Sequence, residues 1–220
     1  MTDEIRPSRY TVSMGVEGEF EPGSNGTVLR NKLGVTSRDE IDRIEYEALM
    51  KAQKEYYRII TPKTRFSAAL LRRMHKDFLG HIYDWAGRYR SVELEKEGFH
   101  WPPAHLIAQN MRSFESGVLT PRTPCVPGPT DQVAEDIAVV HAEFLLIHPF
   151  RDGNGRLARL IADLMSLQAG YPPLDFGFER ISSARGDYVK AVQAGYAKDY
   201  SELKRLIQEA INRSLDSAES

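Results

Sequence analysis

The stretch His148-Pro149-Phe150-Arg151-Asp152-Gly153-Asn154-Gly155-Arg156-Leu157-Ala158-Arg159 is the most informative part of this chain. It brings an imidazole, a carboxylate, two glycines and arginines together within a dozen positions. Such groups can jointly hold a metal-bound polyphosphate and remove a proton beside it. A histidine before proline, an aspartate before glycine or an arginine pair would each, taken singly, favour a structural role. Their combination favours a functional site.

The flanking residues predict the local geometry. From Asp131 onward, apolar residues recur with helical spacing and form one buried stripe. Pro149 disfavours helical backbone at His148, so this helix should end there. A second helix should begin near Asn154 and end at Gly170 and Pro172. The motif is therefore predicted to join two helices through a glycine loop.

A phosphate would fit this loop for a physical reason. The first N–H groups of a helix lack partners within the helix, and the helix dipole adds positive character there. Gly153 and Gly155 allow an anion to approach the backbone closely. Arg156 and Arg159 are three residues apart and can share one face. The loop is therefore a candidate polyphosphate site.

Two further residues of the stretch suggest chemistry. Asp152 could hold Mg2+, which takes oxygen ligands and bridges phosphates. His148 is the candidate general base because the pKa of histidine lies near neutrality. We expect His148 to face solvent at the helix end and Asp152 to be exposed in the loop.

The stretch resembles the signature of the Fic family, His-x-Phe-x-(Asp/Glu)-Gly-Asn-Gly-Arg-x-x-Arg, at every fixed position. Residues 84–90 (Asp-Trp-Ala-Gly-Arg-Tyr-Arg) resemble the segment that leads into the family's flap. Residues 31–36 (Asn-Lys-Leu-Gly-Val-Thr) resemble the entry to a preceding helix in bacterial members. The resemblance extends from Asn31 to about Ile211.

The resemblance implies a protein adenylyltransferase, which moves AMP from ATP to a Ser, Thr or Tyr hydroxyl of a target protein. By the same resemblance, His148 deprotonates the hydroxyl and Asp152 binds the Mg2+ cofactor. The loop of Gly153, Asn154 and Gly155, with Arg156, receives the α- and β-phosphates, and Arg159 pairs with the γ-phosphate.

The resemblance and the helical periodicity together imply an all-α fold, a Fic-type helical bundle with a short β-hairpin flap over the active site. We expect an irregular N-terminal arm over residues 1–36, the Fic domain over 37–215 and a C-terminal tail over 216–220. Ser37 and Glu40 read as a capping box that opens a helix. Further helices are expected over about 67–79, 103–116 (with Gly117 as the stop), 186–196 and 201–215.

The β signal lies between Tyr89 and Trp101, where Val92 and Leu94 alternate with polar residues and residues 96–98 can turn. The pattern fits a hairpin that caps the core. It also fits a flap whose exposed edge, at Val92 and Leu94, pairs with an extended target segment by β-augmentation. The family resemblance favours the flap.

A pattern found in many Fic proteins suggests how the chain is regulated. Many Fic proteins carry (Ser/Thr)-x-x-x-Glu-(Gly/Asn), whose Glu occupies the arginine that matches Arg159. The stretch at residues 36–41 comes close to this pattern but ends in Ile41. The chain thus resembles toxin-type bacterial members, in which a small separate antitoxin supplies the inhibitory Glu. We expect such a partner here.

Composition excludes several other classes. A net charge of −2 argues against a nucleic-acid-binding surface. The chain shows no apolar run of membrane-spanning length and no signal peptide at its polar start, so no membrane association is expected. The single Cys125 excludes an intramolecular disulfide and suits the cytoplasm, either of the producing cell or of another cell into which the protein is delivered.

Alternative functions remain open on the sequence. The same site could transfer another nucleotidyl or phosphoryl group, remove AMP, or bind phosphate without turnover; Asn154 and Arg156 in their full context favour AMP transfer. A metal hydrolase built on His141, His148 and Asp152 is a weaker alternative. The tyrosines at 188, 196 and 200 are expected to pack in the core, with an adenine pocket nearby.

Overall fold

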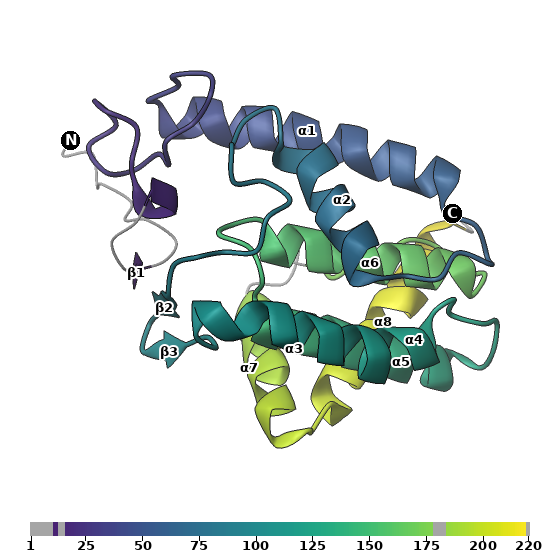
Figure 1. Ribbon diagram of the computed structural model, residues 1–220. Coiled ribbons are helices and arrows are strands. Elements are labelled where there is room, and N and C mark those ends of the chain that lie inside the picture. Colours follow the sequence, from purple (N-terminus) through teal and green to yellow (C-terminus); the bar gives the residue numbers. More distant parts are fainter. Residues whose placement is uncertain (1–10, 13–15, 178–183, 219–220) are drawn as a thin grey trace.

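The computed structural model describes residues 11–12, 16–177 and 184–218, and Figure 1 shows that most of them are helical. The all-α fold with a small β element is therefore confirmed. The principal helices are α1 (Arg38–Ile59), α2 (Ala68–Leu79), α3 (Ile107–Phe114), α5 (Thr130–Ile147), α6 (Asn154–Gln168), α7 (Ala184–Ala194) and α8 (Ser201–Ala218).

Two helices begin where local chemistry predicts. The Ser37 hydroxyl accepts a hydrogen bond from the Glu40 backbone N–H, and the Ser67 hydroxyl accepts one from the Leu70 N–H. Each hydroxyl satisfies an N–H that the first helical turn leaves unpaired. These caps fix the starts of α1 and α2. At the other end of the chain, α8 continues to Ala218, three residues beyond the predicted end of the domain at 215.

Helix α5 forms the centre of the molecule. It packs against α3, α6, α7 and α8, and it is buried along nearly its whole length. The sequence predicts its bounds correctly but predicts a single buried stripe. The structure surrounds the helix on several sides, which accounts for apolar residues such as Val139 and Leu146 outside that stripe.

The prediction that a helix stops at Gly117 is wrong. A short 3-10 turn, η2 (Ala104–Leu106), opens α3, and α3 continues through a π-helical turn, η3 (Glu115–Leu119), into α4 (Thr120–Arg122). The Thr120 N–H donates to the Glu115 carbonyl, five residues back. A widened turn of this kind absorbs the glycine without ending the helix.

The strands lie together at one end of the molecule, near the N-terminal segment (Figure 1). They form an antiparallel sheet in the order β1 (Thr11–Val12), β2 (Leu94–Lys96) and β3 (Phe99–His100). β2 and β3 are the predicted hairpin. Their turn residues, Glu97 and Gly98, both have positive φ, at 52° and 78°.

The N-terminal arm is less irregular than predicted. Its described part contains β1, the 3-10 turn η1 (Val16–Gly18) and an isolated bridge between Phe20 and Leu29. Val28 is buried in a second apolar cluster with residues of α1 and α2. The arm thus packs on the helical domain, and the boundary at residue 36 stays a prediction.

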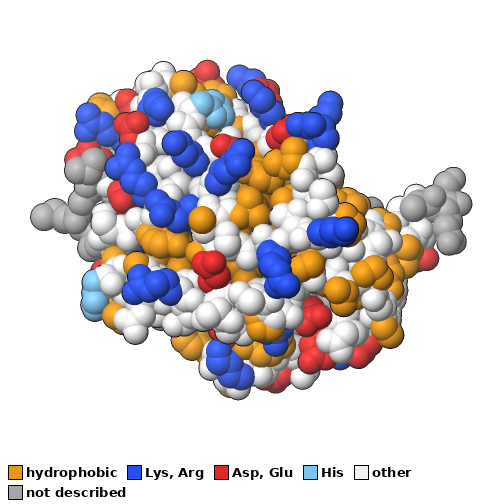
Figure 2. All heavy atoms as spheres, turned by 45° about the vertical axis from the view of Figure 1, so that its right-hand side comes forward, with side chains coloured by type: hydrophobic (Ala, Val, Ile, Leu, Met, Phe, Trp, Pro, Cys, Tyr) orange, Lys and Arg blue, Asp and Glu red, His pale blue; other side chains and the backbone are white. Residues whose placement is uncertain are grey.

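On the face shown in Figure 2, Lys and Arg side chains are interspersed with acidic and hydrophobic ones. Among the described residues, no helix combines the length and the apolar character needed to cross a lipid bilayer.

Candidate active site

His148 caps α5 in the left-handed conformation, with φ 51° and ψ 62°. Its Nδ1 lies 3.1 Å from the Leu145 carbonyl oxygen. A carbonyl can only accept, so Nδ1 carries the proton and Nε2 is the unprotonated nitrogen. Trp101 packs its ring 4.3 Å from the imidazole and donates from Nε1 to the same carbonyl at 2.9 Å. The backbone of α5 and one indole therefore fix the tautomer and the tilt of this ring.

The expectation that His148 faces solvent is wrong, because the residue is 5% exposed. Burial lowers the pKa of His148 to about 4. The hydrogen bond to Leu145 raises this pKa, whereas the positive charge of the Arg90 guanidinium lowers it. The imidazole is neutral at pH 7 and can accept a proton. Burial arises from Trp101 and the hairpin, which pack over the end of α5.

Gly153 and Asn154 shape the loop between α5 and α6. The Asn154 side chain accepts from the Phe150 N–H at 2.9 Å and donates to the Phe150 carbonyl at 2.7 Å, so it fastens the loop to itself. Gly153 has φ 82°, and a Cβ there would lie 2.9 Å from Leu79 Cδ1 and 3.2 Å from His75 Nε2. Only glycine fits this close packing of the loop on α2.

His75 supports the loop from beneath. It is fully buried, its ring stacks on Phe150 with centroids 3.9 Å apart, and its Nδ1 accepts from the Gly87 N–H at 2.9 Å. Nε2 must then carry the proton that the Asp152 carbonyl accepts at 2.9 Å. Burial lowers the pKa of His75 to about 4, so the link is a neutral one.

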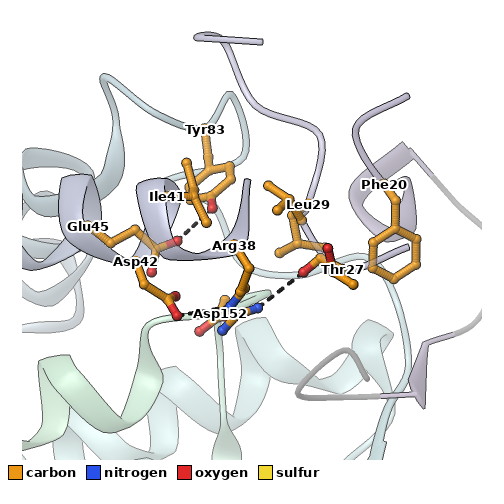
Figure 3. Close-up of a pocket in the computed structure, with 10 residues that line it drawn as sticks. Phe20, Thr27, Leu29, Arg38, Ile41, Asp42, Glu45, Tyr83 and Asp152 are labelled. Atoms are coloured by element: carbon orange, nitrogen blue, oxygen red, sulfur yellow. Dashed lines mark hydrogen bonds and ion pairs between the residues drawn. The ribbon is translucent and has the colours of Figure 1, made fainter. Parts of the chain in front are cut away.

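Asp152 and Arg156 face α1, where they meet Glu45. Arg156 forms an ion pair with Glu45 and a second with Asp152 at 3.3 Å, and the Tyr83 hydroxyl donates to Glu45 at 2.6 Å. Figure 3 shows Glu45, Tyr83 and Asp152 around a small cavity of about 20 Å³ under the N-terminal segment, which Arg38 also lines. The expected exposure of Asp152 is wrong, since the residue is 9% exposed.

A separate cleft of about 450 Å³ is lined by three other motif residues. His148, Gly155 and Arg159 line it together with the hairpin residues Phe99 and Trp101. Its opposite wall is formed by α7, through Tyr188, Val189, Val192 and Gln193. Arg156 and Asp152 are absent from this lining. The two arginines therefore do not share a face as predicted: Arg156 turns toward α1, and Arg159 turns into the cleft.

Comparisons with known proteins show the family to which this chain belongs. A family model described as Fic/DOC family matches residues 65–166. A probable protein adenylyltransferase, y4lH of Sinorhizobium fredii, is 30% identical over 152 residues, covering 68% of this chain and 75% of the relative. The chain belongs to the Fic/DOC family. The probable protein adenylyltransferase Fic of Salmonella typhimurium is 27% identical, over 88% of this chain and 91% of its own.

Animal Fic proteins are longer. The protein adenylyltransferase Fic of Nematostella vectensis is 28% identical over 192 residues, and the chain spans 43% of its length. Among solved structures, the BepC effector of Bartonella tribocorum with bound AMPPNP superposes with a TM-score of 0.73 at 22% identity. That match covers 90% of this chain and 98% of BepC, and it shows that the two proteins share the Fic fold.

Arg90 joins the Fic motif to the hairpin, and the sequence alone gives it no role. Its side chain is fully buried. Nε donates to the His148 carbonyl at 2.9 Å, and the two terminal nitrogens donate to the Val92 and Pro102 carbonyls at 2.8 and 2.6 Å. Its backbone N–H donates to Pro149. One guanidinium thus ties both ends of the hairpin to the histidine.

The hairpin differs from the predicted flap at its edge. Val92 and Leu94 are each 2% exposed and belong to the core. β2 pairs with β3 on one side and with β1 on the other, where Thr11 lies opposite Glu95 and Val12 lies opposite Leu94. The edge of β2 that the sequence predicts to be exposed is therefore taken by the chain itself, and docking of a target at Val92 and Leu94 stays a prediction.

Glu45 and His75 are also absent from the residues that the sequence singles out. Glu45 gives a faint signal, because it lies four residues after Ile41 and three before Ala48, on the apolar stripe of α1. A charge on such a stripe is usually paired when buried. His75 gives none, since its contacts to Gly87 and Asp152 depend on the tertiary fold.

Proposed function

We propose that this Fic protein transfers AMP from ATP to a hydroxyl side chain of a target protein. The observation that carries the proposal is the shared cleft of His148, Gly155 and Arg159, in which His148 is held neutral with Nε2 unprotonated. A general base and a cation beside the N-terminal end of a helix, which favours bound phosphate, suit a nucleotidyl transfer.

The proposed step forms one bond at phosphorus and breaks another. The target hydroxyl oxygen attacks the α-phosphorus of ATP while His148 Nε2 takes the hydroxyl proton. The bond between the α-phosphorus and the oxygen bridging to the β-phosphate breaks, and pyrophosphate leaves. Arg159 would stabilise the terminal phosphates by charge-assisted hydrogen bonds. The unpaired N–H groups at the start of α6, beside Gly155, would receive the inner phosphates.

Mg2+ fits the residues on the α1 side of the loop. Glu45 and Asp152 place two carboxylates against the single guanidinium of Arg156. Among the described residues there is no cluster of three or more metal-binding side chains. This donor set suits an ion that arrives with phosphate oxygens, because Mg2+ is commonly held by one carboxylate plus substrate phosphates. Asp152 would hold the ion, whose charge would offset that of the phosphates.

The comparisons support this proposal. Relatives of comparable length carry the name probable protein adenylyltransferase. Two structural neighbours contain nucleotides, AMPPNP in BepC and ADP in a Bartonella quintana Fic domain with a TM-score of 0.69. Transfer of another nucleotidyl or phosphoryl group, or removal of AMP, would use the same cleft. The contacts of His141 argue against the metal-hydrolase alternative. Its two ring nitrogens lie against the Ala158 carbonyl and the Tyr188 hydroxyl, where they are not available as metal ligands beside His148 and Asp152.

Restraint by a Glu at Arg159 belongs to the proposal as well. A separate antitoxin was expected as its source, but residues 13–18 (Ser-Met-Gly-Val-Glu-Gly) match the inhibitory pattern, so Glu17 of the chain itself is a second candidate. Arg159 lines the open cleft, so a partner helix could place a Glu there and exclude the terminal phosphate. A cytoplasmic site of action, in the producing cell or in another cell, remains part of the same proposal.

The test is labelling of proteins in a cell lysate with ATP that carries the label on its α-phosphate, followed by mass spectrometry of the labelled bands. We expect labelling by the wild type and none by His148→Ala. The matched control is His105→Ala, which changes an exposed histidine outside the cleft. Equal labelling by wild type and His148→Ala would refute the assignment.

A further inference from the structure

The guanidinium of Arg90 contacts three separate stretches of backbone around the end of α5. Each of its three nitrogens donates to a different carbonyl: Nε to His148, and the terminal nitrogens to Val92 and Pro102 on either side of the hairpin. The carboxylate of Glu93 lies 4.0 Å from Nη1, and its side chain is 55% exposed. The buried charge of Arg90 is therefore placed mainly among backbone oxygens.

The backbone of His148 needs support on its carboxyl side. Its φ of 51° and ψ of 62° are unfavourable for a residue that carries a Cβ. On the amino side, the His148 N–H donates to the Phe144 carbonyl at 3.0 Å and so stays attached to α5. On the carboxyl side, Arg90 holds two consecutive carbonyls, that of His148 through Nε and that of Pro149 through its own N–H. The direction in which the imidazole leaves the backbone is therefore set from both sides.

Arg90 also restrains the indole that packs on the imidazole. Pro102 directly follows Trp101, whose ring centroid lies 4.3 Å from that of His148. His148 and Trp101 share one acceptor, the Leu145 carbonyl. The bond from Arg90 to Pro102 therefore holds the indole beside the histidine. Arg90 is absent from the lining of the cleft, so it would act on the reaction through His148 and not by contact with the nucleotide.

We propose that Arg90 is a positioning residue for AMP transfer, which keeps His148 and the hairpin in one fixed arrangement so that the imidazole meets the target hydroxyl. The inference deepens the proposed function and rests on it. A guanidinium suits this role, because its planar fork presents several N–H groups in fixed directions. The ammonium group of a lysine has the same charge but is a single nitrogen, so it cannot reach three separate carbonyls. A displacement of about 1 Å in a reacting geometry can lower a rate about 100-fold.

The test is Arg90→Lys in the full chain, which keeps the charge and removes the fork. We expect target labelling at saturating ATP to fall about 100-fold, with the equilibrium affinity for ATP unchanged. In the His148→Ala background, Arg90→Lys should cause no further loss of labelling, because Arg90 acts through the imidazole. Arg90→Gln takes its place if Arg90→Lys does not fold. Unfolding of both variants would show that Arg90 serves only the fold, and would overturn the inference.

Histidine NMR provides a measurement that does not depend on activity. In protein with isotope-labelled histidine, the ring nitrogens of His148 should report the Nδ1-protonated tautomer in the wild type. Arg90→Lys should lose this fixed tautomer. His75 and His141 are held by other contacts, so their signals should stay unchanged and show that the fold persists.

The matched control is Arg213→Lys, which removes another Nε donor to a backbone carbonyl, that of Asp175 at 2.9 Å, outside the cleft. It should label targets and bind ATP as the wild type does. Unchanged labelling in Arg90→Lys, an equal loss of labelling and ATP affinity, or unchanged His148 signals would overturn the inference alone. Absence of transfer by the wild type would instead overturn the proposed function, and the His148 signals would still decide whether Arg90 positions the ring.

Discussion

At the scale of single residues, the site depends on how completely its polar groups are paired. The His148 ring is held between Leu145 and Trp101, and its carbonyl is held by Arg90. These contacts join residues 47 to 58 positions apart or lie within one helical turn. The motif itself supplies the base, but the tautomer of that base is set by neighbours that the motif does not include.

His148→Ala should reduce transfer by about 100- to 10,000-fold, the usual worth of general-base assistance. ATP binding should persist, because Gly155 and Arg159 still line the cleft. Initial rates of target labelling and equilibrium ATP binding are the two measurements. A variant that lost both equally would show that His148 holds the nucleotide or the fold and has no specific role in the proton transfer.

Asp152→Ala should impair Mg2+-dependent turnover and also lower stability. The stability loss follows from burial, because Arg156 would lose one of its two carboxylate partners. We expect about 1–3 kcal/mol less free energy of unfolding, measured by urea denaturation. Asp84→Ala, at a carboxylate with 85% side-chain exposure, is the control. Full stability together with full activity at limiting Mg2+ would contradict both assignments.

At the scale of elements, several helix ends and the β2–β3 hairpin follow local signals, whereas the pairing of β1 does not. Ser37, Ser67 and Pro149 act within a few residues, so the starts of α1 and α2 and the end of α5 can be predicted from the sequence. The pairing of β1 with β2 joins residues more than 80 positions apart. No local sequence pattern predicts this pairing, because a two-residue strand is too short to show a periodicity.

Removal of residues 1–15 should raise target labelling, if targets pair with the edge of β2. β1 occupies that edge through Thr11 and Val12, and two segments cannot use the same backbone groups. The truncation keeps Glu17, whose carbonyl accepts from Arg151. ATP binding should not change, since the cleft lining lies outside the deleted segment. Lower or unchanged labelling would show that targets dock elsewhere.

At the scale of the whole molecule, three neutral histidines are enclosed in the structure. Burial lowers the pKa values of His75, His141 and His148 to about 4, 3 and 4. The unfolded chain would protonate each near pH 6.5. Because the folded values are lower, unfolding takes up protons below pH 6.5, and stability falls as the pH decreases from there toward 4.

Each of these histidines can lower the free energy of unfolding by up to about 1.4 kcal/mol per pH unit in that window. We therefore expect uptake of about two to three protons on unfolding at pH 5.5. Calorimetry in buffers of different ionisation enthalpy measures that number. Uptake near zero would show that the three rings are protonated in the folded protein or are accessible to solvent.

Contacts between elements that are distant in sequence account for the features of the site that could not be predicted from the sequence. The motif predicts a helix–loop–helix joint and the chemical groups of the site, because both lie within a dozen consecutive residues. Arg156 pairs with Glu45 of α1, whereas Arg159 lines the cleft that α7 closes on its other side, and both α1 and α7 are distant from the motif in sequence. Burial of His148 and Asp152 likewise depends on elements distant in sequence, and their predicted exposure was wrong for that reason.

The most direct test of the central claim compares two forms of ATP, one labelled on the α-phosphate and one on the γ-phosphate, with the same lysate. AMP transfer by the His148 mechanism predicts protein labelling from the α-labelled form, none from the γ-labelled form, and loss of the signal in His148→Ala. Labelling from the γ-labelled form would show phosphoryl transfer, and α-labelling that survives in His148→Ala would contradict the assigned base.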